Sequence, residues 1–319
     1  MRRPPEQKEF DMEELLGDPV VGKRVDLRDI ESTITAICAS PDGGDWERDV
    51  EVILGSKRWR PSAVSNDRRR LLYVFLQEEL PRFVKDRLLL AAPCGIAVTV
   101  ALPIAALYKP DVTTFLASIE ADVLVVDDYV DYRRLKPRDI LTALTDVGVP
   151  LSPESRREIG RGAWAKIGEG TSQERGRRLE ALLAFLFAQV NDLKVLERNY
   201  RTETEEIDLV LQIDNFSPRV WQKSGVPFIL VEAKNRVEKA SQQMISVLLT
   251  KLQTKRGTSR IAFLVSLAGF TESAQLQELR FSNQEMCVVM IGREGLESLI
   301  EADNLDDTLE TMVSHALMR

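Results

Sequence analysis

The sequence predicts an α/β protein with two domains, the second of them built around a central mixed sheet. One reason is length, because a chain of 319 residues exceeds what one ordinary hydrophobic core requires. Another is that short apolar runs typical of strands alternate with segments whose apolar residues recur at helical spacing. After residue 170 these segments follow the order helix–strand–strand–strand–helix–strand–helix–strand–helix, which favours an α/β sandwich.

The N-terminal half is expected to form a separate α/β domain over residues 1–150. A strand at 96–102, a helix at 111–119 and a strand at 121–127 favour parallel strands with a right-handed crossover. We expect the other elements of this half to be helices at 26–38, 67–89 and 138–145 and a hairpin at 46–62. Residues 151–170 are rich in Pro, Gly and Ser, which predicts a linker. This half contains no recognisable motif, and we expect it to serve in recognition, sensing or regulation.

The C-terminal half, 171–319, shows clearer signals. Thr171 and Glu174 match a capping box, and leucines at helical spacing follow them. The remaining apolar patterns predict strands at 194–199, 206–213, 228–234, 261–266 and 287–291, and helices at 239–255 and 272–279.

The strand at 228–234 ends in two charged residues. Side chains alternate across a strand, so Glu232 and Lys234 share one face of an otherwise apolar segment. Burying an unpaired charge is costly, and a bound divalent metal would give the pattern a reason. A solvated strand end is the alternative, because 29% of the residues in this chain are charged.

Two more carboxylates are placed to join this pair. Asp208 lies opposite the apolar row of its strand, and Glu180 borders the apolar stripe of the first C-terminal helix. If the two strands are neighbours, Asp208 and Glu232 meet, and clustered carboxylates need a cation such as Mg²⁺. Lys234 would then orient or deprotonate an attacking water, or stabilise the transition state of phosphate hydrolysis.

These residues resemble the motifs of the PD-(D/E)xK nuclease superfamily. The similarity covers about residues 170–319 and is greatest to the Mrr-like restriction-endonuclease branch. It is carried by the stretches Gly176–Glu180, Glu206–Asp208, Val231–Asn235 and Ile261–Ala274. The resemblance implies a restriction-endonuclease-like sandwich and phosphodiester hydrolysis that depends on Mg²⁺, with Mn²⁺ able to substitute.

The resemblance also implies roles for individual residues. Asp208 and Glu232 would ligate the metal, Lys234 would be catalytic, and Glu180 would support the metal directly or through water. Gln242 or Gln243 would match an accessory glutamine of the family. The proline that the family often carries before the strand acid is absent, so Glu206 remains an alternative to Asp208.

Contacts with DNA are less defined by the sequence. Arg177 and Arg178, which follow Arg175 on the same helix, would meet phosphates or form a solvated face. Trp221 would stack on nucleic acid or cover an edge of the core. Three acids that follow a predicted strand allow a second metal site or a helix cap. They are Asp127, Asp128 and Asp131.

Composition narrows the chemistry and the location. The single histidine, His315, lies near the C-terminus, which argues against a histidine base or a histidine-bound metal. Three separated cysteines give no disulfide framework, which fits a reducing cytoplasm. The net charge of −7 argues against a general nucleic-acid coat but allows a local basic groove. The uncharged stretch Leu88–Tyr108 is long enough for a membrane span, but its Pro and Gly residues favour a buried strand entering a helix.

Together these patterns predict a cytoplasmic, metal-dependent endonuclease that cleaves DNA in bacterial restriction or anti-phage defence. A homodimer or a larger homo-oligomer is expected, because cutting both strands generally needs two sites, and no membrane partner is expected. Two alternatives stay open. One is a catalytically silent module that binds nucleic acid or protein, and the other is a DNA repair or junction nuclease.

Overall fold

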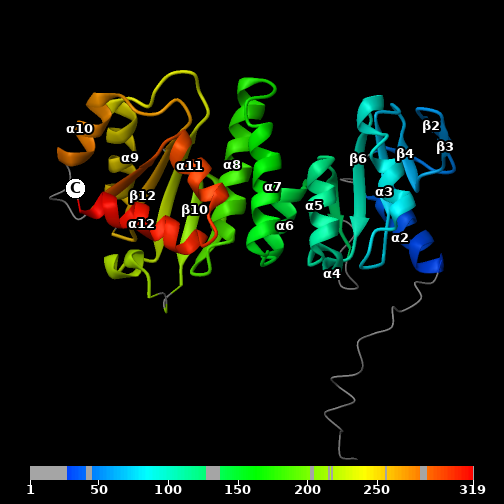
Figure 1. Ribbon diagram of the computed structural model, residues 1–319, viewed down its shortest axis with the longest axis horizontal. Helices are drawn as coiled ribbons and strands as arrows, with labels where there is room; N and C mark the ends of the chain where they lie inside the picture. Colours follow the sequence, from blue (N-terminus) through cyan, green and yellow to red (C-terminus); the bar gives the residue numbers. More distant parts are fainter. Residues whose placement is uncertain are drawn as a thin grey trace, which may run out of the picture.

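The computed structural model describes residues 27–40, 45–126, 137–201, 205–214, 216, 218–255, 257–280 and 286–318. Two mixed sheets lie toward opposite ends of the long axis of the molecule, and a layer of helices separates them (Figure 1). The predicted α/β class is therefore confirmed.

The N-terminal sheet has the strand order β1-β4-β5-β6-β7-β8. Strands β5, β6 and β7 are parallel, as predicted for the last two, and the remaining pairs are antiparallel. The strands are β1 (Trp46–Glu47), β4 (Ala63–Ser65), β5 (Arg70–Val74), β6 (Ala97–Leu102), β7 (Asp122–Val125) and β8 (Arg138–Asp139). The predicted hairpin is present as β2 (Val52–Leu54) and β3 (Lys57–Trp59). The helices of this half are α2 (Leu27–Ala39), α3 (Arg82–Leu88), α4 (Ile104–Leu107), α5 (Pro110–Ser118) and α6 (Ile140–Val147).

The helix predicted over residues 67–89 is wrong in its first half, which forms strand β5. Leu71 and Leu72 point to opposite faces of the sheet, and both are fully buried. Leu71 packs in the core shared with α5 and α6, whereas Leu72 packs against α2. A strand buried on both faces gives a continuous apolar run, which periodicity alone does not distinguish from a helix.

The stretch Leu88–Tyr108 forms the end of α3, strand β6 and helix α4. The prediction of a buried strand that leads into a helix is therefore confirmed for this stretch. Within the part of the chain that the structure describes, no helix is both long and apolar enough to cross a membrane.

The C-terminal sheet has the strand order β13-β12-β11-β10-β9. Strands β11, β12 and β13 are parallel, and β9, β10 and β11 are antiparallel. The strands are β9 (Leu193–Arg201), β10 (Glu206–Ile213), β11 (Phe228–Lys234), β12 (Ser259–Ser266) and β13 (Cys287–Ile291). The helices are α8 (Ser172–Ala188), α9 (Gln242–Thr254), α10 (Glu272–Arg280), α11 (Arg293–Glu301) and α12 (Leu305–Leu317). The predicted capping box at Thr171 is confirmed, because both of its reciprocal hydrogen bonds form.

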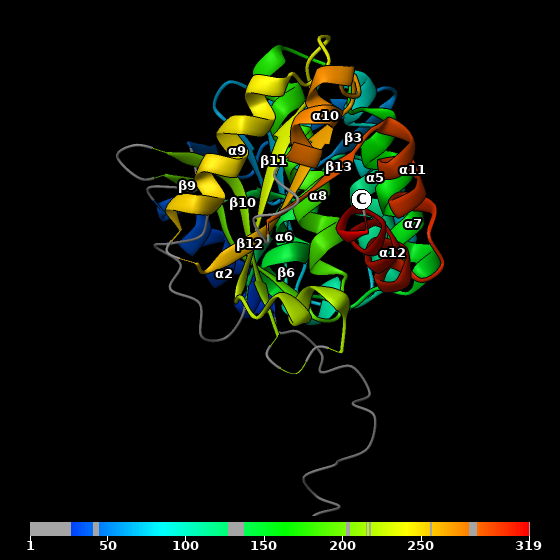
Figure 2. The same ribbon diagram turned by 90° about the vertical axis from the view of Figure 1, so that its left-hand side faces the viewer.

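One continuous core joins the two halves. On the inner face of the C-terminal sheet, Phe263 of β12 stacks on Phe187 of α8, with ring centroids 5.1 Å apart. The same cluster continues through α7, α5 and α6 to the inner face of the N-terminal sheet. Helices α9 and α10 cover the outer face of the C-terminal sheet, which has its own apolar cluster (Figure 2). Residues of the central strands β10 and β11 are therefore buried on both faces of the sheet.

The segment 151–170, predicted as a linker, contains helix α7 (Pro153–Ala165). Ser152 caps this helix, and Pro153 occupies its first turn. Gly160 packs closely on α11, since a Cβ there would lie 3.2 Å from Ile300 Cγ2. Arg157 pairs with Asp303 just beyond α11. The prediction of a linker is wrong because α7 gains its stability from tertiary partners rather than from an apolar stripe.

Candidate active site

Strands β10 and β11 bring two carboxylates to one face of the C-terminal sheet. The antiparallel register pairs Val210 with Leu230, and both side chains belong to the outer-face cluster. The paired register ends where Leu209 lies opposite Val231, and Asp208 and Glu232 are the next residues along the two strands. Asp208 is only 9% exposed, and its neighbour Ile207 is fully buried.

Lys234 lies between the two carboxylates. Its Nζ is 2.6 Å from Glu232 Oε1 and 3.8 Å from Asp208 Oδ2. Asp208 Oδ2 also accepts a 2.6 Å hydrogen bond from the backbone N–H of Ala233. The three side chains on which the predicted site depends therefore share one pocket, and two of them come from one strand.

A second lysine, which the sequence analysis missed, completes the cluster. Lys251 of α9 donates to Glu232 Oε2 at 2.8 Å and also to the backbone carbonyl of Glu206. It lies on the buried side of α9, where its neighbours Leu248 and Leu252 are apolar. A lysine inside an apolar helical stripe is unusual, and that departure is the signal that could have identified it.

Burial and mutual repulsion set the electrostatics of the acids. Burial raises the pKa of Asp208, the charge of Glu232 raises it further, and Lys234 opposes both effects. Burial also raises the pKa of Glu180 on α8, with Asp208 as the next contributor. A hydrogen bond from Asn199 opposes that rise. The acids thus repel one another in a partly desolvated site, where a cation would be favoured.

The carboxylates present match a hard metal ion in part. Two carboxylates on adjacent strands suit Mg²⁺, which takes one or two protein carboxylates and completes its shell with water and phosphate oxygens. Among the described residues, no three Asp, Glu, His or Cys side chains are grouped to hold a metal ion. The three-carboxylate set of Asp208, Glu232 and Glu180 is therefore not assembled here, and the role of Glu180 stays a prediction.

The predicted accessory glutamines lie elsewhere on α9. Gln242 donates to Gln277 of α10 at 3.0 Å, and Gln243 is exposed. The contact that α9 makes with Glu232 comes from Lys251, about two and a half turns further along the helix than Gln242. Their accessory role stays a prediction.

The predicted nucleic-acid contacts have mixed outcomes. Trp221 is fully buried within the core cluster, so it presents no exposed face to a base, which favours the alternative that it covers part of the core. Arg178 pairs with Glu120 at 3.1 Å, and Arg177 is exposed. The acids Asp127, Asp128 and Asp131 lie outside the described residues.

Comparison with protein-family models, with curated proteins and with solved structures finds no match for this chain. An α/β fold hosts many unrelated activities, so the function has to be inferred from the side chains at the site. Those side chains are two acids and two lysines, held together at the end of strands β10 and β11.

Proposed function

We propose that this chain is a Mg²⁺-dependent endonuclease of the PD-(D/E)xK type, with a restriction-endonuclease-like C-terminal fold. It would hydrolyse phosphodiester bonds in DNA, in the cytoplasm, as part of restriction or anti-phage defence. The pathway rests on the resemblance to the Mrr-like branch alone.

The observation that carries the proposal is the meeting of Asp208, Glu232 and Lys234. Two acids from adjacent strands lie against one ammonium group, 2.6 and 3.8 Å from its nitrogen. A purely structural ion pair would need one acid, and the second one raises the electrostatic cost of the site. Perturbed acids of this kind concentrate at functional sites.

Each residue has a role in the proposed reaction. Asp208 and Glu232 would hold Mg²⁺, which supplies Lewis-acid stabilisation of charge on the scissile phosphate. Lys234 would orient the attacking water or take its proton, and the proton would leave with the departing oxygen. Lys251 positions Glu232 by holding its second oxygen.

A second candidate function is a catalytically silent module that binds nucleic acid or protein. It is favoured by the engagement of both Glu232 oxygens, one by Lys234 and one by Lys251. A carboxylate neutralised on both sides has less need of a metal. A repair or junction nuclease differs from the first proposal only in its substrate.

Cleavage assays with Glu232→Gln separate these candidates. Wild-type protein and the variant are incubated with duplex, nicked and branched DNA and with RNA, in Mg²⁺, Mn²⁺ or EDTA. An enzyme predicts cleavage that EDTA and Glu232→Gln abolish, while DNA binding by the variant persists. Binding without cleavage of any substrate would support the silent module.

We also propose a homodimer, since breaks in both strands require two sites facing the duplex. Light scattering of the free protein and of a complex with duplex DNA gives the mass directly. A monomer in both states would argue for nicking rather than cutting both strands.

A further inference from the structure

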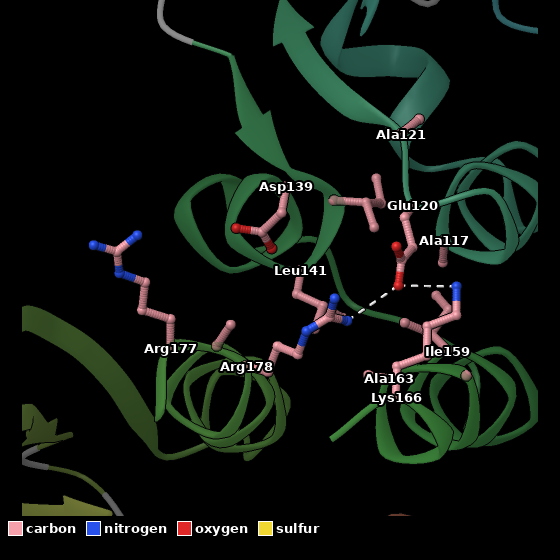
Figure 3. Close-up of a pocket in the computed structure, with 13 residues that line it drawn as sticks. Ala117, Glu120, Ala121, Asp139, Leu141, Ile159, Ala163, Lys166, Arg177 and Arg178 are labelled. Atoms are coloured by element: carbon pink, nitrogen blue, oxygen red, sulfur yellow. Dashed lines mark hydrogen bonds and ion pairs between the residues drawn. The ribbon is translucent and has the colours of Figure 1, made fainter. Parts of the chain in front are cut away.

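A cavity of about 320 Å³ lies between the two halves of the molecule, away from the strand ends of the C-terminal sheet. Its lining comes from α5 and α6 of the N-terminal half and from α7 and α8 of the C-terminal half (Figure 3). Its volume falls within the range of small-molecule sites, which often form where two halves of a protein meet.

The charged side chains of this cavity include more cations than acids. Its lining contains three cationic side chains, Lys166, Arg177 and Arg178, and two acidic ones, Glu120 and Asp139. Asp139 is used as the cap of α6, where it accepts from the backbone N–H of Thr142. Two of the three cations, Lys166 and Arg178, contact Glu120, which caps no helix, whereas Arg177 lies apart from it (Figure 3).

Glu120 occupies the place that an anion would take. Lys166 Nζ lies 2.9 Å from Glu120 Oε1, and Arg178 Nη1 lies 3.1 Å from the same oxygen (Figure 3). Glu120 lies in the turn between α5 and β7 with a backbone φ of 51°, a conformation that residues other than glycine seldom adopt. Its side chain is 48% exposed, so an incoming anion displaces it at small cost.

The remaining walls are small and apolar. Ala117, Ala121, Ala163 and Ile159 line the cavity. Gly162 of α7 also lines it, and a Cβ added there would meet no atom within 4 Å. The space beside this glycine is thus empty rather than filled by a neighbouring side chain.

We propose that this cavity binds a small organic phosphate monoester. Its phosphate would replace the Glu120 carboxylate between Lys166 and Arg178, with Arg177 at the mouth, and its organic body would lie on the apolar wall. A phosphate fits better than a carboxylate because its three terminal oxygens allow bidentate binding to the Arg178 guanidinium together with a bond to the Lys166 ammonium.

The cavity is joined to the candidate active site by two connections, so we propose that its ligand regulates that site; this part rests on the proposed nuclease function. Arg177, Arg178 and Glu180 are neighbours on α8. Asn235, which follows Lys234, donates through Nδ2 to the carbonyl of Ile167 at 2.8 Å and to that of Arg175 at 2.9 Å. The carbonyl of Ile167 belongs to the connection between α7 and α8, and that of Arg175 belongs to the first turn of α8.

Calorimetric titration with 5′-AMP in EDTA tests the binding site without metal or DNA. Adenosine and inorganic phosphate serve as the two halves of the probe. We expect saturable binding of AMP at one site per chain, with both halves at least tenfold weaker. Failure of AMP to bind, or equal binding by phosphate alone, would overturn the proposal.

Three variants locate the bound probe. Gly162→Leu adds bulk at an exposed residue that lines the cavity and should weaken binding about tenfold or more, whereas Ala165→Leu adds the same bulk at an exposed residue of α7 that does not line it. Arg178→Gln should weaken binding about tenfold or more, and Arg175→Gln is its control outside the cavity. Glu120→Gln should tighten binding about two- to fivefold because it removes the competing carboxylate. Unchanged binding by Gly162→Leu would overturn the proposal by placing the probe elsewhere.

Hydrogen exchange distinguishes failure of this proposal from failure of the nuclease proposal. AMP should slow amide exchange at residues 175–181 and 233–235 in the wild type and in Glu232→Gln alike. That readout requires no cleavage, so binding with altered exchange upholds the cavity even if no DNA is cut. Binding that leaves residues 233–235 unchanged overturns the connection to the active site.

Discussion

Two clusters of charged side chains in the C-terminal half can be compared directly. In the candidate active site, Asp208 and Glu232 meet Lys234 and Lys251 on the outer face of the sheet. In the second cluster, Arg219 lies just before the 3₁₀ segment Val220–Ser224 and contacts several acids, most of them on α12. Its partners within 4 Å include Asp192, Asp306, Asp307 and Glu310.

The pKa values of the acids shift in opposite directions in the two clusters. Hydrogen bonding to Arg219 lowers the pKa of Glu310, so the folded protein favours the ionised form. Burial raises the pKa of Asp208, so the folded protein disfavours its charge. The comparison teaches that the Arg219 cluster stabilises the fold, whereas the active-site cluster is maintained at a cost to stability.

Removing the central ammonium of the site gives the largest effect we expect. Lys234→Met should lower the rate of DNA cleavage by about 10²–10⁴-fold, because it removes the group that orients or deprotonates water. The melting temperature should fall as well, because Asp208 and Glu232 lose the ammonium that lies between them, so the rate is compared per folded molecule. Lys223→Met, at an exposed residue, is the control, and cleavage by Lys234→Met at the wild-type rate would remove lysine from the mechanism.

The next effect concerns the positioning of Glu232. Lys251→Met should reduce cleavage by about 10–100-fold, the usual cost of removing a residue that orients a ligand. Single-turnover rates across a Mg²⁺ titration should reach half of their maximum at a higher Mg²⁺ concentration than in the wild type, while DNA binding is kept. Lys255→Met changes the C-cap residue of α9, whose Nζ lies 2.7 Å from Glu205 Oε2, and should leave the rate unchanged. If both variants lose activity equally, the loss reflects α9 rather than Glu232.

The Arg219 cluster should respond in stability alone. Arg219→Met should lower the free energy of unfolding by about 1–3 kcal/mol, because it removes hydrogen bonds between charged groups. Cleavage per folded molecule should stay the same. Arg201→Met breaks the exposed pair with Glu206 and should cost about 0–1 kcal/mol. A loss of activity in correctly folded Arg219→Met would contradict the division into two kinds of cluster.

The smallest effect is the opposite pH dependence of the two clusters. The raised pKa of Asp208 means that the native state holds this proton more tightly than the unfolded state. Its contribution to stability therefore falls as the pH rises from the usual carboxylate range through the raised pKa. Glu310, with its lowered pKa, loses its contribution as the pH falls through that pKa.

Denaturant unfolding at roughly pH 4 to 8 checks these signs. Asp208→Asn should remove the decline at higher pH and gain stability relative to the wild type near neutral pH. Glu310→Gln should lose stability near neutral pH and converge on the wild type in acid. Parallel curves for Asp208→Asn and wild type would mean that burial of Asp208 carries no cost.

Much of the C-terminal sheet could be predicted because its signals are local. The bounds of β10, β11 and β13 agree with the alternation and turn residues in the sequence. The convergence of Asp208 with Glu232 followed from strand alternation and from adjacent strands. The catalytic and metal-binding roles of these residues remain predictions.

The misses share a dependence on tertiary partners. Strand β5 looked helical because both of its faces are covered, and α7 looked like a linker because ion pairs and a close glycine contact hold it. Lys251 was missed because the sequence does not fix which turn of α9 faces Glu232. The burial of Trp221 depends on how its 3₁₀ segment (Val220–Ser224) packs in the core, which residue type alone does not reveal.

The arginines of α7 set a limit on how the molecule can be divided. Arg156 donates to the carbonyl of Ala302, Arg157 pairs with Asp303, and Arg161 pairs with Glu301. A fragment that started at residue 171 would leave these acids without their counterions and expose the apolar side of α8. A fragment that begins just upstream of Ser152 would keep these three contacts of α7, whereas keeping the apolar side of α8 covered also requires α6.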